Sequence, residues 1–232
     1  DLESGADLLA ELGESLPLDL PFRDETGKAV LLGDYFGAKP VLLTFVYYRC
    51  PVLCPQIIIG TAAAMKGVAY EPGQEFEVVF VSFDPEDTPE TAAERKSSAV
   101  ARYGKPGSAA GWHFLTGDAD SIARLTAAAG FRYAWDPTIR QFAHASGIVI
   151  ATPDGRLARY LYGVEYAPKD LKLALFEASE GRIGGLAARV SRASALLRTR
   201  VDIAREQQNQ LMLAAMNRRS RLQLKLQQAV VK

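Results

Sequence analysis

The residues of this chain that can most readily bind a metal ion or exchange electrons are two cysteines and two histidines. Its 232 residues contain only Cys50 and Cys54, four positions apart, and only His113 and His144. Thiolates are soft ligands that select Cu(I), zinc or iron–sulfur centres over hard cations. Because residues four apart share one face of a helix, both sulfurs could face one metal ion or each other. The pair therefore predicts a metal site or a redox-active dithiol.

The position of the cysteine pair favours this chemistry over a structural role. Residues 40–48 form a continuous apolar run that predicts a strand buried on both faces, and the pair follows directly. Pro51 and Pro55 then predict the first turn of a helix over residues 56–68. The N-terminus of a helix favours anions and lowers thiol pKa values. Two buried core thiols are the alternative, although an adjacent pair beside two prolines is unusual in a core.

The order of predicted elements indicates an α/β fold with a mixed sheet. It fits a thioredoxin-like fold with an added N-terminal β-hairpin. Turn residues and apolar runs predict the hairpin strands at 18–22 and 28–32, further strands at 76–83, 112–115, 147–152 and 157–162, and helices at 89–103, 118–129 and 168–179.

A third ligand is available near the predicted strand at 147–152. His144 lies just before this strand, in a loop that can face the active-site helix of such a fold. Two thiolates and one imidazole form a three-coordinate set suited to Cu(I), with room for a fourth ligand in Cu(II), whereas structural zinc sites usually have four protein ligands. His113 stands between Trp112 and Phe114, so we interpret it as a packed residue. Asp84 and Asp87 are predicted to cap the helix that begins near residue 89, and a role in copper transfer is the alternative.

The chain is predicted to have two parts, a thioredoxin-like domain at 1–183 and a basic amphipathic helical extension at 184–232. Charge is uneven, because the chain is neutral overall while residues from Gly181 onward hold eleven Lys or Arg and two acids. Apolar residues recur there at helical spacing, and Pro and Gly are absent after Gly185. Two interpretations stay open: a solvated helix, or an assembly device that pairs with a second copy of the chain or meets an acidic partner or anionic lipid.

The motifs taken together resemble the SCO/SenC family of copper-binding, thioredoxin-like cytochrome c oxidase assembly proteins. The resemblance covers about residues 16–180, and His144 follows Cys54 by 90 positions, close to the usual separation in the family. It departs at Ala143, where many members have an acidic residue. The matching segments are FVYYRCPVLCP at 45–55, VSFDPEDTP at 81–89, WHFLTG at 112–117, and the histidine ahead of PDG at 153–155.

The resemblance implies a function, a cofactor and a partner. By it, Cys50, Cys54 and His144 are the ligands of one copper ion, as Cu(I) or Cu(II). The implied role is to deliver copper to the dinuclear site of cytochrome c oxidase subunit II, or to reduce the thiols of that site. We expect no nucleic-acid partner.

The resemblance also implies a compartment, since copper delivery to the oxidase happens outside the cytoplasm. We expect a periplasmic protein, or one held on the periplasmic face of a membrane by an anchor or by the basic tail. The sequence itself shows no signal peptide and no apolar run of the roughly 18 residues that span a bilayer.

An enzyme on the same fold is the alternative. Cys50 and Cys54 would then be the catalytic redox pair of a thiol–disulfide oxidoreductase or peroxidase. The spacing is C-x3-C rather than the C-x2-C of thioredoxins, and Thr44 lies six residues before Cys50 rather than the three of peroxiredoxins. Copper loading requires the reduced pair in either case.

Overall fold

A five-stranded mixed sheet forms the centre of the protein in the computed structural model, which describes residues 8, 11–138 and 140–183. The strand order is β5-β4-β3-β8-β9, in which β3, β4 and β5 run parallel and β8 and β9 are antiparallel to their neighbours. The sheet strands are β3 (Val41–Val46), β4 (Glu77–Ser82), β5 (Trp112–Leu115), β8 (Gly147–Ala151) and β9 (Leu157–Tyr162).

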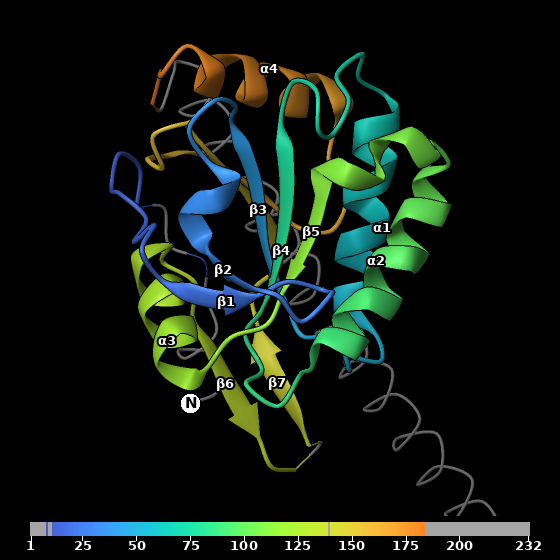
Figure 1. Ribbon diagram of the computed structural model, residues 1–232, viewed down its shortest axis with the longest axis vertical. Helices are drawn as coiled ribbons and strands as arrows, with labels where there is room; N and C mark the ends of the chain where they lie inside the picture. Colours follow the sequence, from blue (N-terminus) through green and yellow to red (C-terminus); the bar gives the residue numbers. More distant parts are fainter. Residues whose placement is uncertain (1–7, 9–10, 139, 184–232) are drawn as a thin grey trace, which may run out of the picture. The chain divides into compact units, whose positions relative to one another are not determined.

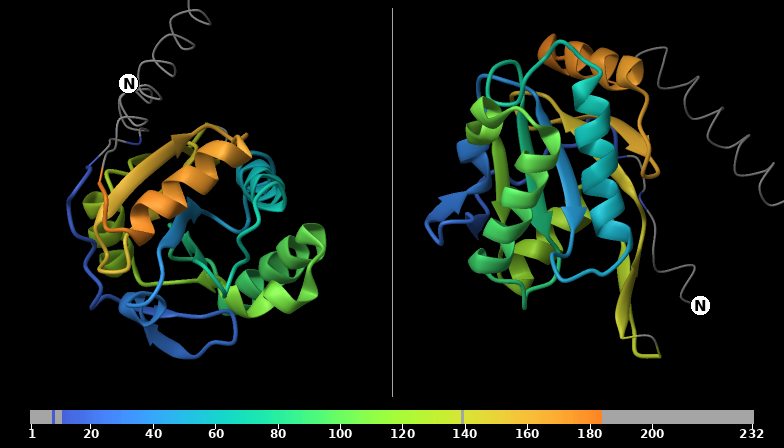
Figure 2. Two further views of the ribbon diagram at one scale, coloured as in Figure 1. Left: turned by 90° about the horizontal axis from the view of Figure 1, so that it is seen from above. Right: turned by 90° about the vertical axis from the view of Figure 1, so that its right-hand side faces the viewer.

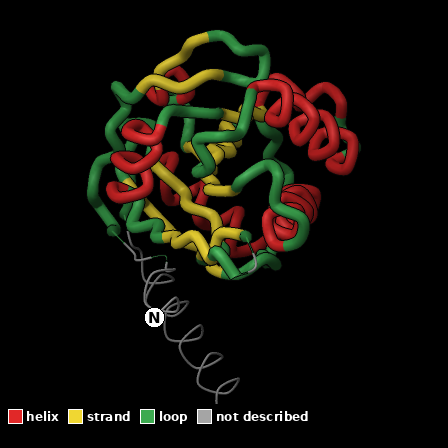
Figure 3. The backbone as a smooth tube through the Cα atoms, turned by 90° about the horizontal axis from the view of Figure 1, so that it is seen from below, coloured by secondary structure: helices red, strands yellow, loops and turns green. Residues whose placement is uncertain are grey.

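In the described part of the chain, four α-helices cover the sheet (Figure 1). α1 contacts both α2 and α4, while α2 packs on β5 and α4 packs on β8 and β9. α3 lies on the other side of the sheet, together with the N-terminal hairpin (Figures 1 and 2). Seen from below, the helices surround the central strands (Figure 3). The helices are α1 (Leu53–Lys66), α2 (Pro89–Tyr103), α3 (Ala119–Ala128) and α4 (Pro168–Ser179), with short 3-10 helices at Leu32–Tyr35 and Pro106–Gly111.

Two small antiparallel hairpins are added to this core. β1 (Pro21–Arg23) pairs with β2 (Ala29–Leu31), as the sequence predicts. β6 (Tyr133–Asp136) pairs with β7 (Gln141–His144) in a second hairpin that extends beyond the sheet (Figure 2) and that the sequence did not predict. This second hairpin matters for function, because its last residue is His144.

The sequence of the central strands accounts for their position. Every residue of β3 is buried, as its continuous apolar run predicts, because α1 and α4 lie on one side and β1–β2 and α3 on the other. α1 approaches the β9–α4 loop so closely that only glycine fits at position 60. A Cβ on Gly60 would lie 1.7 Å from the carbonyl oxygen of Val164. Close packing therefore fixes the helix that carries Cys54.

The α/β order and the mixed sheet confirm the predicted fold class, with one change near the cysteines. α1 begins at Leu53, three residues earlier than predicted, so Cys54 lies in its first turn and Cys50 lies outside the helix. The shared helix face expected for the two sulfurs is therefore wrong. The proposed extension at 184–232 lies outside the described residues, so the domain boundary stays a prediction. No helix in the described ranges is long and apolar enough to cross a membrane.

Candidate metal centre

Three side chains from three elements meet at one end of the sheet. Cys50 lies in the loop that follows β3, Cys54 lies in the first turn of α1, and His144 ends β7. One ligand atom from each residue lies within 4.8 Å of the other two. The thiol pair and the histidine predicted from sequence are thus brought together, across 90 residues of chain, by the unpredicted β6–β7 hairpin.

Backbone amides point at both sulfur atoms. The N–H of Cys54 donates to Cys50 Sγ at 3.4 Å, and the N–H of Tyr47 donates to Cys54 Sγ at 3.3 Å. Val52, the N-cap residue of α1, makes no side-chain capping bond, so the Cys50 sulfur satisfies one of the free amides of the first turn. An anionic sulfur fits this place because the N-terminus of a helix is electropositive.

His144 is oriented by its own backbone and by aromatic rings. Its Nδ1–H donates to the carbonyl oxygen of Ala145 at 2.8 Å, which leaves Nε2 without a proton in the neutral ring. Nε2 lies 3.5 Å from Cys54 Sγ. The rings of Tyr47 and Phe83 contact the imidazole edge-on. A backbone carbonyl thus orients the imidazole, the role that an acidic neighbour at position 143 would otherwise play.

The environment makes the two thiols unequal. A hydrogen bond from Cys54 holds the pKa of Cys50 well below its usual range, which outweighs burial, and a bond from Tyr47 acts in the same direction. Burial raises the pKa of Cys54, and the positive charge of Arg95 acts against that rise. Cys50 is therefore the more readily ionised thiol of the reduced pair, and Cys54 is the less readily ionised one.

The donor set fits a soft, low-coordinate metal ion. It offers two sulfurs and one imidazole nitrogen, and no other Cys, His, Asp or Glu in the described ranges joins the group. Both cysteines are almost fully buried. Soft thiolates and an imidazole suit Cu(I), whereas a hard cation would need oxygen ligands. The three residues thus match a copper site better than a closed four-ligand zinc site.

Residues from the β4–α2 loop hold the loop that carries Cys50. The fully buried carboxylate of Asp87 accepts hydrogen bonds from the Tyr48 N–H at 2.6 Å, the Ser82 hydroxyl at 2.6 Å and the Arg49 Nε–H at 3.2 Å. Asp87 therefore does not cap α2, and that prediction is wrong. The cap is Thr88, whose side chain accepts from the N–H of Thr91.

The second predicted capping residue, Asp84, also acts elsewhere. Its carboxylate forms an ion pair with Arg49 at 2.7 Å and accepts from the N–H of Glu86. Glu86 forms a further ion pair with Arg49 at 3.0 Å. Three acids of one loop therefore surround the guanidinium of the residue before Cys50.

Comparisons with known proteins agree with this geometry. The SCO1/SenC family model matches residues 17–175. The chain belongs to the SCO1/SenC family. A second family model, a protein of unknown function (DUF3422), matches residues 173–231. No curated protein matches the chain significantly.

Solved structures with a similar fold include several Sco proteins. A proposed electron transfer protein from Aquifex aeolicus VF5 is 27% identical, with a TM-score of 0.66 over 76% of this chain and 98% of that one. Arabidopsis thaliana ScoI, solved with copper bound, is 21% identical, with a TM-score of 0.56 over 70% and 96%. BsSco, a Sco family member in which a disulfide switch was identified, is 23% identical, with a TM-score of 0.57 over 75% and 97%.

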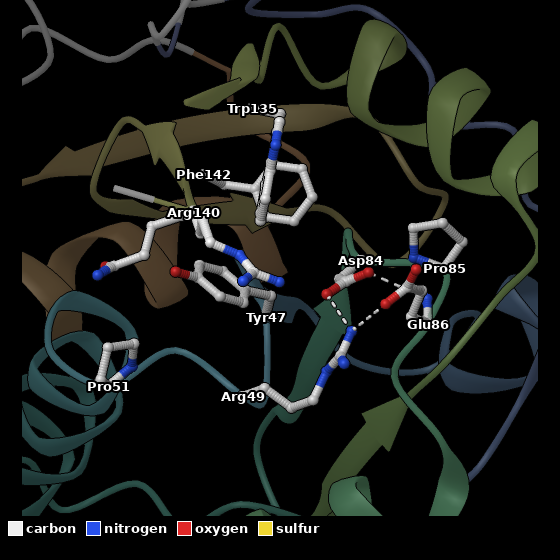
Figure 4. Close-up of a pocket in the computed structure, with 10 residues that line it drawn as sticks. Tyr47, Arg49, Pro51, Asp84, Pro85, Glu86, Trp135, Arg140 and Phe142 are labelled. Atoms are coloured by element: carbon white, nitrogen blue, oxygen red, sulfur yellow. Dashed lines mark hydrogen bonds and ion pairs between the residues drawn. The ribbon is translucent and has the colours of Figure 1, made fainter. Parts of the chain in front are cut away.

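A pocket of about 600 Å³ opens beside the metal centre of this SCO1/SenC family member (Figure 4). Tyr47 and Pro51, which flank the Cys50 loop, line it together with Phe142 from β7. Arg49 with its acidic partners lies on one side, and Arg140 and the half-exposed Trp135 lie on the other. The pocket lining thus includes both sequence neighbours of Cys50, Arg49 and Pro51.

His113 is not part of the metal centre. It lies on β5, where its Nε2 is 3.0 Å from a carboxylate oxygen of Glu77 and its ring contacts Tyr35. Glu77 also forms an ion pair with Lys39. His113 is thus packed against Tyr35, as predicted, and also makes a polar contact with Glu77.

Proposed function

We propose that this SCO1/SenC protein binds one copper ion through Cys50, Cys54 and His144 and passes it to a partner protein. The single observation that carries the proposal is the meeting of two sulfurs and one imidazole nitrogen within 4.8 Å. Family membership supports copper as the metal. Copper is cargo in this role, so the site must bind it tightly and still release it.

The proposed client is the dinuclear copper site of cytochrome c oxidase subunit II. Support comes from the relative BsSco, which is described as a cytochrome c oxidase assembly protein. The pocket would receive the client loop, because Arg49 and Pro51, the two sequence neighbours of Cys50, line it. We also place the protein outside the cytoplasm, since a relative from Bacillus anthracis, 18% identical, is described as a lipoprotein.

Thiol–disulfide exchange is the second candidate, favoured by the unequal thiols. The Cys50 thiolate would attack a client disulfide, form a mixed disulfide and release one client thiolate. Cys54, after losing its proton to solvent, would then attack Cys50 and release the second client thiolate. The pair is oxidised to a disulfide and the client is reduced to two thiols, so the electrons balance. Both cysteines are free in the structure.

One sample separates the two functions. We expect the reduced protein to bind one Cu(I) per chain, and the Cys50–Cys54 disulfide to bind none, because disulfide sulfurs offer no thiolate charge. Disulfide-reductase turnover should be slow. Equal copper uptake by oxidised and reduced protein would overturn the copper proposal, and rapid turnover without copper binding would favour the enzyme.

We further propose that residues 1–183 suffice for copper binding, since all three donor residues precede residue 184. A chain that ends at residue 183 should take up as much copper as the full chain. Lower stoichiometry in the shorter chain would show that residues 184–232 belong to the domain. Light scattering on the two chains would also test assembly through the tail.

A further inference from the structure

A cationic residue of α2 reaches the loop that carries Cys50. Arg95 is partly buried in the middle of α2. Its Nε–H donates to the carbonyl oxygen of Tyr48 at 2.6 Å, and an Nη2–H makes a longer bond to the carbonyl oxygen of Cys50 at 3.4 Å. No ion pair among the described residues includes Arg95. Its hydrogen bonds are thus directed at the carbonyls of the cysteine loop.

These two bonds complete the attachment of a segment that has no regular structure. Between the end of β3 at Val46 and the start of α1 at Leu53, the loop makes few backbone bonds. The Tyr48 N–H is held by Asp87, and the Cys50 N–H donates to the Tyr47 carbonyl at 3.2 Å. Arg95 fixes the carbonyl side of the same segment. A planar guanidinium can hold two carbonyls at once, which a lysine ammonium on one flexible stem does less well.

The charge of Arg95 also matches the charge of a loaded centre. Two thiolates and a neutral imidazole around Cu(I) carry one net negative charge. The centre is buried, so water screens this charge weakly. Arg95 places a positive charge, with no acidic partner of its own among the described residues, beside this negative charge and stabilises it.

We propose that Arg95 is a positioning residue of the metal centre: by its bonds to two carbonyls it holds the Cys50 loop in the geometry that the two-sulfur site needs. The inference rests on the proposed copper function. Arg95 does not touch the metal in this scheme, because its donors are engaged by Tyr48 and Cys50 carbonyls. Its effect is exerted through the geometry and the field of the cysteine pair.

The test compares two variants. Arg95→Met removes both the planar guanidinium and the positive charge, whereas Arg95→Lys removes the guanidinium and retains the charge. Arg102→Met is the matched control, since Arg102 is an exposed arginine of the same helix. Two quantities are measured on reduced protein: hydrogen exchange of the amides at residues 47–54 without metal, and Cu(I) affinity by competition with a chelator. Thermal unfolding of each variant reports any general loss of stability.

We expect Arg95→Met to exchange the loop amides about tenfold faster and to bind Cu(I) about tenfold more weakly, while amides of β3 and β4 keep their protection. Arg95→Lys should lose less affinity, and Arg102→Met should match the wild type. Unchanged loop exchange, or faster exchange with unchanged Cu(I) affinity, would overturn the inference. If the wild-type protein itself bound no copper, the proposed function would fail first and the inference with it.

Discussion

Replacing Asp87 with alanine tests whether one buried carboxylate holds the cysteine loop in place. The side chain has no exposed surface and accepts bonds from Tyr48, Ser82 and Arg49. In Asp87→Ala the Tyr48 N–H stays buried without an acceptor, which costs about 1–3 kcal/mol. The Ser82 hydroxyl keeps a second acceptor in the Asp84 carbonyl at 3.4 Å.

The other contact of Asp87 adds little to this loss. Arg49 is 48% exposed, so its ion pair contributes at most about 1 kcal/mol. A total loss of about 2 kcal/mol in the free energy of unfolding lowers the melting temperature of a domain of this size by about 4–8 °C. We expect this shift for Asp87→Ala in thermal unfolding of the reduced, metal-free protein at neutral pH.

Asp87→Asn separates the acceptor from its charge. The asparagine oxygen can still accept from Tyr48 and Ser82. Burial raises the pKa of Asp87 above its ordinary value, outweighing the bonds that lower it, so folding disfavours the charged form. Because the folded pKa lies above the unfolded one, the contribution of this group to the stability of the folded protein rises as pH falls through the folded pKa. The melting temperature of the Asp87→Asn variant, which has a neutral side chain here, should therefore be close to that of the wild type at pH 7.

Glu86→Ala is the control, because Glu86 belongs to the same ionic cluster but has a 77% exposed side chain. Its melting temperature should match that of the wild type within about 2 °C. The reasoning would be refuted if Asp87→Ala melted like the wild type, or if Asp87→Asn lost as much stability as Asp87→Ala.

Three further predictions concern the thiols, an acidic cluster and helix packing. The reduced protein should show one thiolate by ultraviolet absorbance at about pH 6, where an ordinary cysteine is less than about 1% ionised. Cys54→Ala should move the titration of Cys50 to higher pH, because it removes the main hydrogen-bond donor of the Cys50 sulfur. Hydrogen bonds from its histidine and lysine partners lower the pKa of Glu77 despite burial, so its stabilisation is present above its ordinary pKa and is lost as pH falls through the lowered one. Glu77→Gln should therefore lower the melting temperature at pH 7, and by progressively less as the pH is lowered below the ordinary pKa of a glutamate. Gly60→Ala should destabilise the protein by about 1–3 kcal/mol in urea unfolding, whereas Gly107→Ala, with nothing within 4 Å of the added Cβ, should not.

Local patterns in the sequence predicted most of the sheet and the helices. The apolar run at β3 and the Pro89 start of α2 are strong signals, because each depends on neighbouring residues alone. The β6–β7 hairpin has no such signal. Its residues are nearly all half-buried and do not alternate between polar and apolar, so no period marks the strands.

The three donor residues of the site could be predicted from the sequence, whereas the groups that hold them in position could not. Two cysteines and one histidine in a chain with so few of either drew attention by type and spacing. The carboxylate of Asp87 and the guanidinium of Arg95 act through contacts between distant parts of the chain. The carbonyl of Ala145 bonds the neighbouring His144, but no pattern of residue types marks that bond. Asp87 looked like a helix cap because it stands two residues before Pro89. The carboxylate of Asp87 instead accepts a hydrogen bond from the buried backbone N–H of Tyr48, a contact that the sequence does not reveal.

The central claim is that two sulfurs and one histidine nitrogen bind copper. X-ray absorption at the copper edge, on Cu(I)-loaded wild-type protein and on His144→Ala, measures this most directly. The wild type should show two sulfurs and one imidazole nitrogen around each copper. His144→Ala should retain the two sulfurs and lose the imidazole scattering. An unchanged first shell in His144→Ala, or a wild-type shell with fewer than two sulfurs, would contradict the account.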